Sequence, residues 1–237
     1  MTPTNTSIWS ALRYPSFRAL WRSGGIYFIG NAMQVMAAAW MMVELTGSDF
    51  LAASVQTAVF LPMFLLSLPA GVMADITDRR RLMLAALLTQ AAVGALLAVL
   101  LFAGWAGPGT LMFFVFIGGC CAALMAPAYN SSIVDTIPRD ELPPAITAVG
   151  IAYNAARALG PALAGLVFAL GGAWNFVLAV ASTLLMAYTV HRWPPLPHPP
   201  SRLPAERLWG GMLSALRFAR HSEAVLAQLV RTVAYSG

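Results

Sequence analysis

Residues 82–105 read LMLAALLTQAAVGALLAVLLFAGW, a run of 24 residues without a charged side chain. A helix rises about 1.5 Å per residue, so a run of this length spans the roughly 30 Å hydrocarbon core of a bilayer. Five further runs have a similar length and apolar character, at 23–45, 51–73, 111–133, 145–168 and 173–193. The sequence therefore predicts an all-α integral membrane protein with six membrane-spanning helices.

Composition supports this class and argues against several others. Of the 237 residues, 59% are hydrophobic and 10% are charged, whereas soluble domains average about 25% charged residues. The two cysteines, Cys120 and Cys121, are adjacent and match no zinc or redox spacing. We find neither a glycine-rich phosphate loop nor a nucleophile–base arrangement. The sequence thus predicts a protein that is not an enzyme and has no cofactor or metal site.

The arginines predict the topology. All 14 cationic residues are arginines, and 12 of them flank the runs on one side, against none in the other three joints. An excess of positive charge marks the cytoplasmic side. We therefore expect a multi-pass protein of the cell membrane with a cytoplasmic N-terminus. The net charge of +5 is then a topology signal in a lipid bilayer, and no nucleic-acid partner is expected. The 12 are Arg13, Arg18, Arg22, Arg79, Arg80, Arg81, Arg139, Arg192, Arg202, Arg207, Arg217 and Arg220.

Four segments follow from this pattern. Residues 1–22 form a cytoplasmic N-terminal segment, and residues 23–193 form the six-helix bundle. Residues 194–223 form a proline-rich cytoplasmic linker with an amphipathic helix, and residues 224–237 start a seventh helix too short to span. Helices in the first and third segments either lie along the inner membrane surface or are ordinary loop helices.

The joint between the second and third runs reads GVMADITDRRR over residues 71–81. On composition alone, its arginines either anchor the loop on the positive side or contact helix ends and acids there. The stretch resembles the signature loop of the major facilitator superfamily. Gly71, Asp75, Arg79 and Arg80 match that signature, whereas Ile76 and Asp78 depart from it.

Three other stretches are similar to one branch of this superfamily, which contains enterobactin-type siderophore exporters, macrolide efflux proteins and secretion effectors. They are GNAMQ at 30–34, ELTGS at 44–48 and NAARALGPALAG at 154–165. The resemblance implies the N-terminal six-helix bundle of a two-bundle fold, with the C-terminal half missing. It also implies that residues 71–81 act as a cytoplasmic latch between the bundles, with Asp135 as the expected partner of Arg79.

The fifth run carries small residues every four positions from Ala148 to Ala164, a stripe that lets another helix approach closely. Gly160, Pro161 and Gly165 match the antiporter motif of the resembled family, although three of its other glycines are replaced by Thr147, Ala156 and Ala164. The resemblance favours export over uptake. Packing of small residues within a bundle is compatible with the same pattern.

Arg157 lies near the middle of the fifth run, where a charge costs at least about 2.5–3.5 kcal/mol. We expect it either to face a cavity or to bond to the backbone and to Asn154. Asn31, Gln34 and Asn130 are candidates to line the same cavity, and interhelical hydrogen bonds are the alternative for each. No carboxylate lies at this depth, so Glu44 near the outer end is the candidate for proton coupling here, and an acid in the missing half is the alternative.

These features predict a major facilitator-type exporter of a small molecule, a siderophore or a drug, that works by proton-coupled alternating access. The alternative is a non-transporting membrane scaffold, or a half-transporter that needs a partner bundle.

Overall fold

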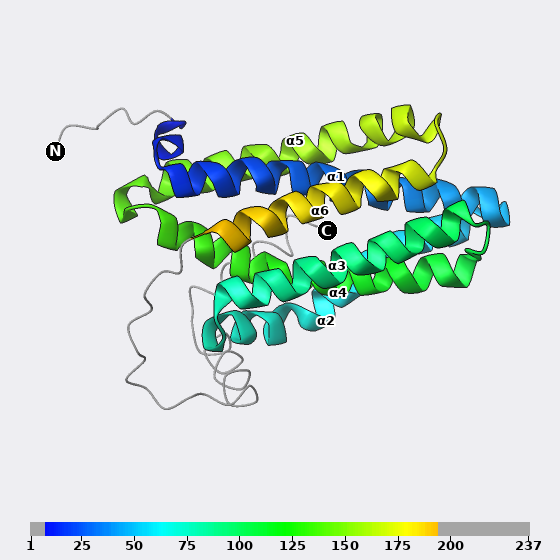
Figure 1. Ribbon diagram of the computed structural model, residues 1–237, viewed down its shortest axis with the longest axis horizontal. Coiled ribbons are helices and arrows are strands. Elements are labelled where there is room, and N and C mark those ends of the chain that lie inside the picture. Colours follow the sequence, from blue (N-terminus) through cyan, green and yellow to red (C-terminus); the bar gives the residue numbers. More distant parts are fainter. Residues whose placement is uncertain (1–7, 194–237) are drawn as a thin grey trace, which may run out of the picture.

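The computed structural model describes residues 8–193 and is helical throughout that range apart from short joints (Figure 1). Six helices are long and apolar enough to cross a membrane, which confirms the predicted class and number of spans in this part of the chain. The predicted linker at 194–223 and seventh helix at 224–237 lie outside the described residues. The helices are α1 (Pro15–Thr46), α2 (Asp49–Ile76), α3 (Arg79–Phe102), α4 (Pro108–Thr136), α5 (Leu142–Phe168) and α6 (Ala173–Arg192), with 3₁₀ turns η1 (Ser10–Arg13) and η2 (Arg139–Glu141).

Several helices extend beyond the apolar runs that predict them. Helix α1 begins at Pro15, well before residue 23, because proline at a first helical position needs no hydrogen-bond partner for its nitrogen. Helix α3 begins at Arg79, directly after Asp78, whose carboxylate accepts a 3.0 Å hydrogen bond from the Arg81 amide. Capping residues therefore set the helix ends, whereas hydropathy marks only the part inside the hydrocarbon.

The joints alternate between the two ends of the bundle (Figure 1). The joints at 77–78 and 137–141, the start of α1 and the end of α6 lie at one end, which we call the arginine end because Arg79, Arg139 and Arg192 belong to it. The other three joints lie at the opposite end. The arginines of residues 8–193 that flank the spans on one side in the sequence therefore lie at one end of the bundle.

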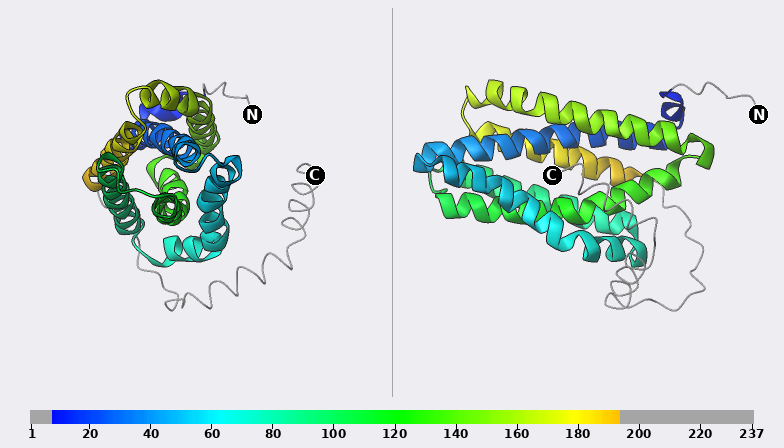
Figure 2. Two further views of the ribbon diagram at one scale, coloured as in Figure 1. Left: turned by 90° about the vertical axis from the view of Figure 1, so that its right-hand side faces the viewer. Right: turned by 180° about the vertical axis from the view of Figure 1, so that it is seen from behind.

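Helices α1 and α4 occupy equivalent positions in the packing. Helix α1 packs on α5 and α6, and α4 packs on α2 and α3, while α3 and α6 also contact each other. Seen along the bundle axis, α1 runs between α5, α6 and α2 (Figure 2, left). Exchanging α1–α3 with α4–α6 therefore reproduces the main contacts of the bundle, as expected for two three-helix repeats, of which an odd number of spans inverts the second in the membrane.

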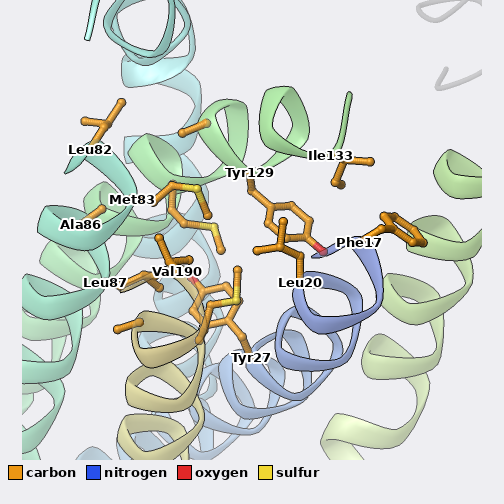
Figure 3. Close-up of a cluster of buried hydrophobic side chains, with 14 of the residues drawn as sticks. Phe17, Leu20, Tyr27, Leu82, Met83, Ala86, Leu87, Tyr129, Ile133 and Val190 are labelled. Atoms are coloured by element: carbon orange, nitrogen blue, oxygen red, sulfur yellow. The ribbon is translucent and has the colours of Figure 1, made fainter. Parts of the chain in front are cut away.

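Two clusters of buried side chains hold the bundle, one in each half of its length. The cluster at the arginine end includes Phe17, Leu20, Leu87 and Met186, and Figure 3 shows its core around Tyr129. The cluster at the opposite end includes Met42 and Phe176.

Candidate functional site

An ion pair joins α3 and α4 at the arginine end. Arg79, the first residue of α3, pairs with Asp135 near the end of α4, and the two side chains are 24% and 29% exposed. Arg80 donates from Nε to the Val190 carbonyl oxygen at 3.2 Å and from a terminal nitrogen to the His191 carbonyl oxygen. The start of α3 is therefore tied to the ends of both α4 and α6.

Gly71 and Asp75 lie on α2, one turn apart, and are not part of this contact. A Cβ on Gly71 would meet no atom of residues 8–193 within 4 Å. Asp75 is exposed, and no ion pair joins it to another residue of the described bundle. The structure thus brings together Arg79 and Asp135 among the expected latch residues and leaves Gly71 and Asp75 on an uncovered face of α2.

The small residues of α5 pack against α1. A Cβ on Gly160 would lie 2.5 Å from the Ala32 Cβ, and one on Gly165 would lie 3.2 Å from the Trp40 ring. Trp21 adds a polar contact between the same helices, because its Nε1 donates to the Ala148 carbonyl oxygen at 2.8 Å. The glycines of the antiporter-type motif are therefore contact points between α5 and α1.

The flank of α5 beside this contact is exposed and carries Arg157. Its guanidinium carbon lies 6.0 Å from the centroid of the Tyr153 ring, one turn earlier on the helix. The Asn154 amide donates to the Gly150 carbonyl oxygen at 2.9 Å, within its own helix. No ion pair involves Arg157 within residues 8–193. The ring contact of Arg157 is thus with its own helix, and both expected roles of this residue stay predictions.

An aromatic bridge connects Arg157 to the interior. Phe28 of α1 makes edge contacts with Tyr129 of α4 and Tyr153 of α5, with centroid separations of 5.7 and 5.4 Å and interplanar angles of 88° in both cases. Such perpendicular contacts suit the charge distribution of aromatic rings. Sequence reasoning missed this bridge; its only signal is that Phe28 lies three residues before Asn31, on the same face of α1.

Asn31 and Gln34 line a cavity of about 20 Å³ together with Gln90, between α1, α2, α3 and α4. That volume holds about one water molecule. Gln90 is buried and accepts a 3.0 Å hydrogen bond from the Tyr27 hydroxyl. Asn130 is exposed on α4. The candidate cavity residues thus form two groups, Asn31 with Gln34 and Asn154 with Arg157, and Asn130 belongs to neither.

Glu44 lies at the opposite end of the bundle. It is exposed and lines a groove of about 520 Å³ between α1 and α5. The other lining residues include Trp40, Gly165 and Phe168, and the Trp40 and Phe168 rings stack edge to face at 5.4 Å. The one carboxylate considered for proton coupling therefore adjoins a glycine of the α5 motif.

The sequence profile of the transmembrane secretion effector family, a major facilitator family, matches residues 6–237. The chain belongs to this family. The bundle described above is accordingly the N-terminal bundle of a major facilitator fold, and the protein is a membrane protein of a transporter family that binds small molecules.

Individual relatives are similar at low identity. They include macrolide efflux protein A of Streptococcus pyogenes, 25% identical over 72% of this chain and 42% of the relative. The staphyloferrin A transporter of Staphylococcus aureus is 25% identical over 70% of this chain and 42% of its own length. The enterobactin exporter EntS of Shigella boydii is 26% identical over 86% and 49%, respectively. The matched region spans less than half the length of these relatives. No solved structure gives a significant match.

Proposed function

We propose that the complete protein exports a small organic molecule, a siderophore or a drug-like compound, by proton-coupled alternating access. The observation that carries the proposal is family membership over residues 6–237, with relatives that are named as efflux and export proteins. The close contact of Gly160 with α1 supports it, because an export-type motif here lies where two helices must stay tightly packed.

The arginine end is proposed to face the cytoplasm, since positive charge accumulates on that side of membrane proteins. Gly71 and Asp75 would then contact the second bundle of the complete protein, on the uncovered face of α2. The pair of Arg79 with Asp135 would hold the start of α3 in place for this contact. Opening and closing of this surface would form the cytoplasmic latch.

Glu44 is the proposed proton-coupling residue within the described bundle. A carboxylate that takes part in coupling must be reached by protons and must adjoin an element that moves. Glu44 meets the first condition, because it is exposed and lines the groove between α1 and α5. For the second, we propose that the width of this groove changes during transport. Glu44→Gln should therefore retain substrate binding and lose the dependence of transport on a proton gradient.

Cells that express the complete protein should accumulate less of at least one labelled siderophore or macrolide than cells with an empty vector. A protonophore should abolish the difference. Higher accumulation in expressing cells would reverse the proposed direction. Equal accumulation of every compound, with the protein inserted at a normal level, would favour the non-transporting scaffold.

A further inference from the structure

Arg157 sits in an environment that differs from that of every other arginine in the described bundle. It is the sixteenth of the 27 residues of α5, so it lies near the middle of the span. The acids of residues 8–193 all lie near the two ends, at 44, 49, 75, 78, 135, 140 and 141. A cation at this depth needs water, a cavity or an opposite charge.

A second tyrosine–arginine pair in the same bundle differs from the Tyr153–Arg157 pair in its hydrogen bonding and in its position. Arg192 lies over the Tyr188 ring at 5.6 Å, with the same spacing of four residues, and its Nε donates to the Tyr188 hydroxyl at 3.1 Å. That pair lies at the arginine end, where water and lipid headgroups are in reach. Arg157 lies over the Tyr153 ring without such a hydrogen bond in the described structure, and its side chain is exposed.

The aromatic bridge supplies the second half of a binding site. Tyr153 is 45% exposed, and its other ring contact is a perpendicular one with Phe28, which also contacts Tyr129. The Tyr153 ring is therefore held against α1, while nearly half of its surface stays exposed. Asn31 follows Phe28 by three residues on the same face of α1. An aromatic ligand that contacts the exposed part of Tyr153 would have the Arg157 guanidinium beside it.

We propose that this face of α5, completed by Phe28 of α1, binds an anionic aromatic compound, with Arg157 paired to the anionic group and the exposed part of Tyr153 in contact with the aromatic ring. The inference rests on the proposed function, since this compound class would be the exported substrate. Guanidinium groups bind carboxylates through two parallel hydrogen bonds and also attract aromatic faces, so one side chain recognises both features. With the acids confined to the bundle ends, a bound anion at mid-span meets no like charge from the described residues.

The test uses the complete protein purified in lipid nanodiscs and radiolabelled 2-naphthoate as the probe. Equilibrium dialysis should show saturable binding of 2-naphthoate. Binding of 2-naphthylmethylamine, which has the ring with a positive charge, should be far weaker. Cyclohexanecarboxylate, which has the charge without the aromatic ring, should also bind more weakly.

Variants then assign the contacts. Arg157→Gln should weaken 2-naphthoate binding roughly 10- to 100-fold, the effect of one lost charge-assisted contact. Arg157→Lys should retain part of the affinity, and Tyr153→Leu should lower it at unchanged charge. Arg192→Gln is the matched control and should bind like the wild type. If Arg157→Gln does not fold, Arg157→Lys and Tyr153→Leu decide the question.

Unchanged affinity in Arg157→Lys and Tyr153→Leu, or equal binding of the cationic probe, would overturn the inference. An acid from elsewhere in the complete protein that pairs with Arg157 would give these same results and would overturn the inference as well. The two proposals can fail separately. Efflux of some compound without binding of 2-naphthoate leaves the export function standing and removes the substrate class. Binding of 2-naphthoate that depends on Arg157, without efflux of any compound, would support the binding site and remove the export function.

Discussion

Gly160 of α5 lies against Ala32 of α1 so closely that a Cβ on the glycine would come within 2.5 Å of the Ala32 Cβ. Real Cβ atoms do not approach a neighbour to that distance, so the two helices can pack as they do only with glycine at this position. The same pair of helices is joined again at Trp40 and Gly165. The contact between α1 and α5 therefore depends on individual glycines.

Gly160→Ala should destabilise the protein by about 1–3 kcal/mol, because the added methyl group forces α1 and α5 apart. Gly150→Ala is the matched control, since a Cβ at Gly150 on the same helix meets nothing within 4 Å. That change should be neutral or stabilising by up to about 1 kcal/mol through helix propensity. Thermal unfolding of the complete protein in detergent measures both. Adding Ala32→Gly to Gly160→Ala should restore stability, and a failure to do so would argue against this contact as the cause.

Tyr27→Phe should destabilise the protein by about 1–2 kcal/mol, because it leaves the buried Gln90 oxygen without its hydroxyl donor. The double variant Tyr27→Phe with Gln90→Leu removes both partners and should be closer to the wild type than Tyr27→Phe alone. A double-mutant cycle on the thermal unfolding midpoints gives the coupling. Additive effects would show that the hydrogen bond is not what stabilises this part of the bundle.

Exchanging the charges of Arg79 and Asp135 should leave stability unchanged or raise it. Arginine at the first position of α3 and aspartate near the end of α4 both oppose the helix dipoles, and the exchange reverses this. Each single variant, Arg79→Gln or Asp135→Asn, should instead lose roughly 0.5–1 kcal/mol. If transport requires arginine on α3 and aspartate on α4, the protein with exchanged charges should be stable but should transport more slowly. Equal transport rates would leave the pair with a structural role alone.

Asp75→Asn should slow transport roughly tenfold, the effect of one charge-assisted hydrogen bond lost from one conformation, with membrane insertion intact. Asp78→Asn serves as the control, because asparagine also caps a helix and the Asp78 carboxylate accepts from the Arg81 amide. Initial rates of efflux, normalised to protein in the membrane, compare the two. Normal transport in Asp75→Asn would remove this residue from the latch.

Much of the fold follows directly from local sequence. The six spans, their alternation and the arginine end need only hydropathy and charge, because lipid forces each span to satisfy its own backbone hydrogen bonds. The helix ends were less accurately predicted. Pro15 and Asp78 set them by capping outside the hydrocarbon, where hydropathy carries no information.

The site residues also divide into those that local sequence predicts and those that only tertiary contacts bring together. Arg157 was predictable as an unusual residue, since a charge in an apolar run is visible in the sequence. Its neighbours were not, because Phe28 and Tyr153 are 125 positions apart and neither has a distinctive local context. Asn31 and Gln34 were candidates for a polar cavity or for interhelical hydrogen bonds, and the structure places them with Gln90 around a small cavity.

The sequence by itself therefore determined the class of protein, the number of spans and the side of the bundle on which the arginines lie, since each depends on one segment and its surroundings in lipid. The tertiary structure alone decided which helix faces meet. It placed Gly160 on Ala32, Arg79 on Asp135 and Phe28 between two tyrosines, and it left Arg157 facing outward. Such pairings depend on close packing between distant segments, where a single methyl group decides whether two helices fit.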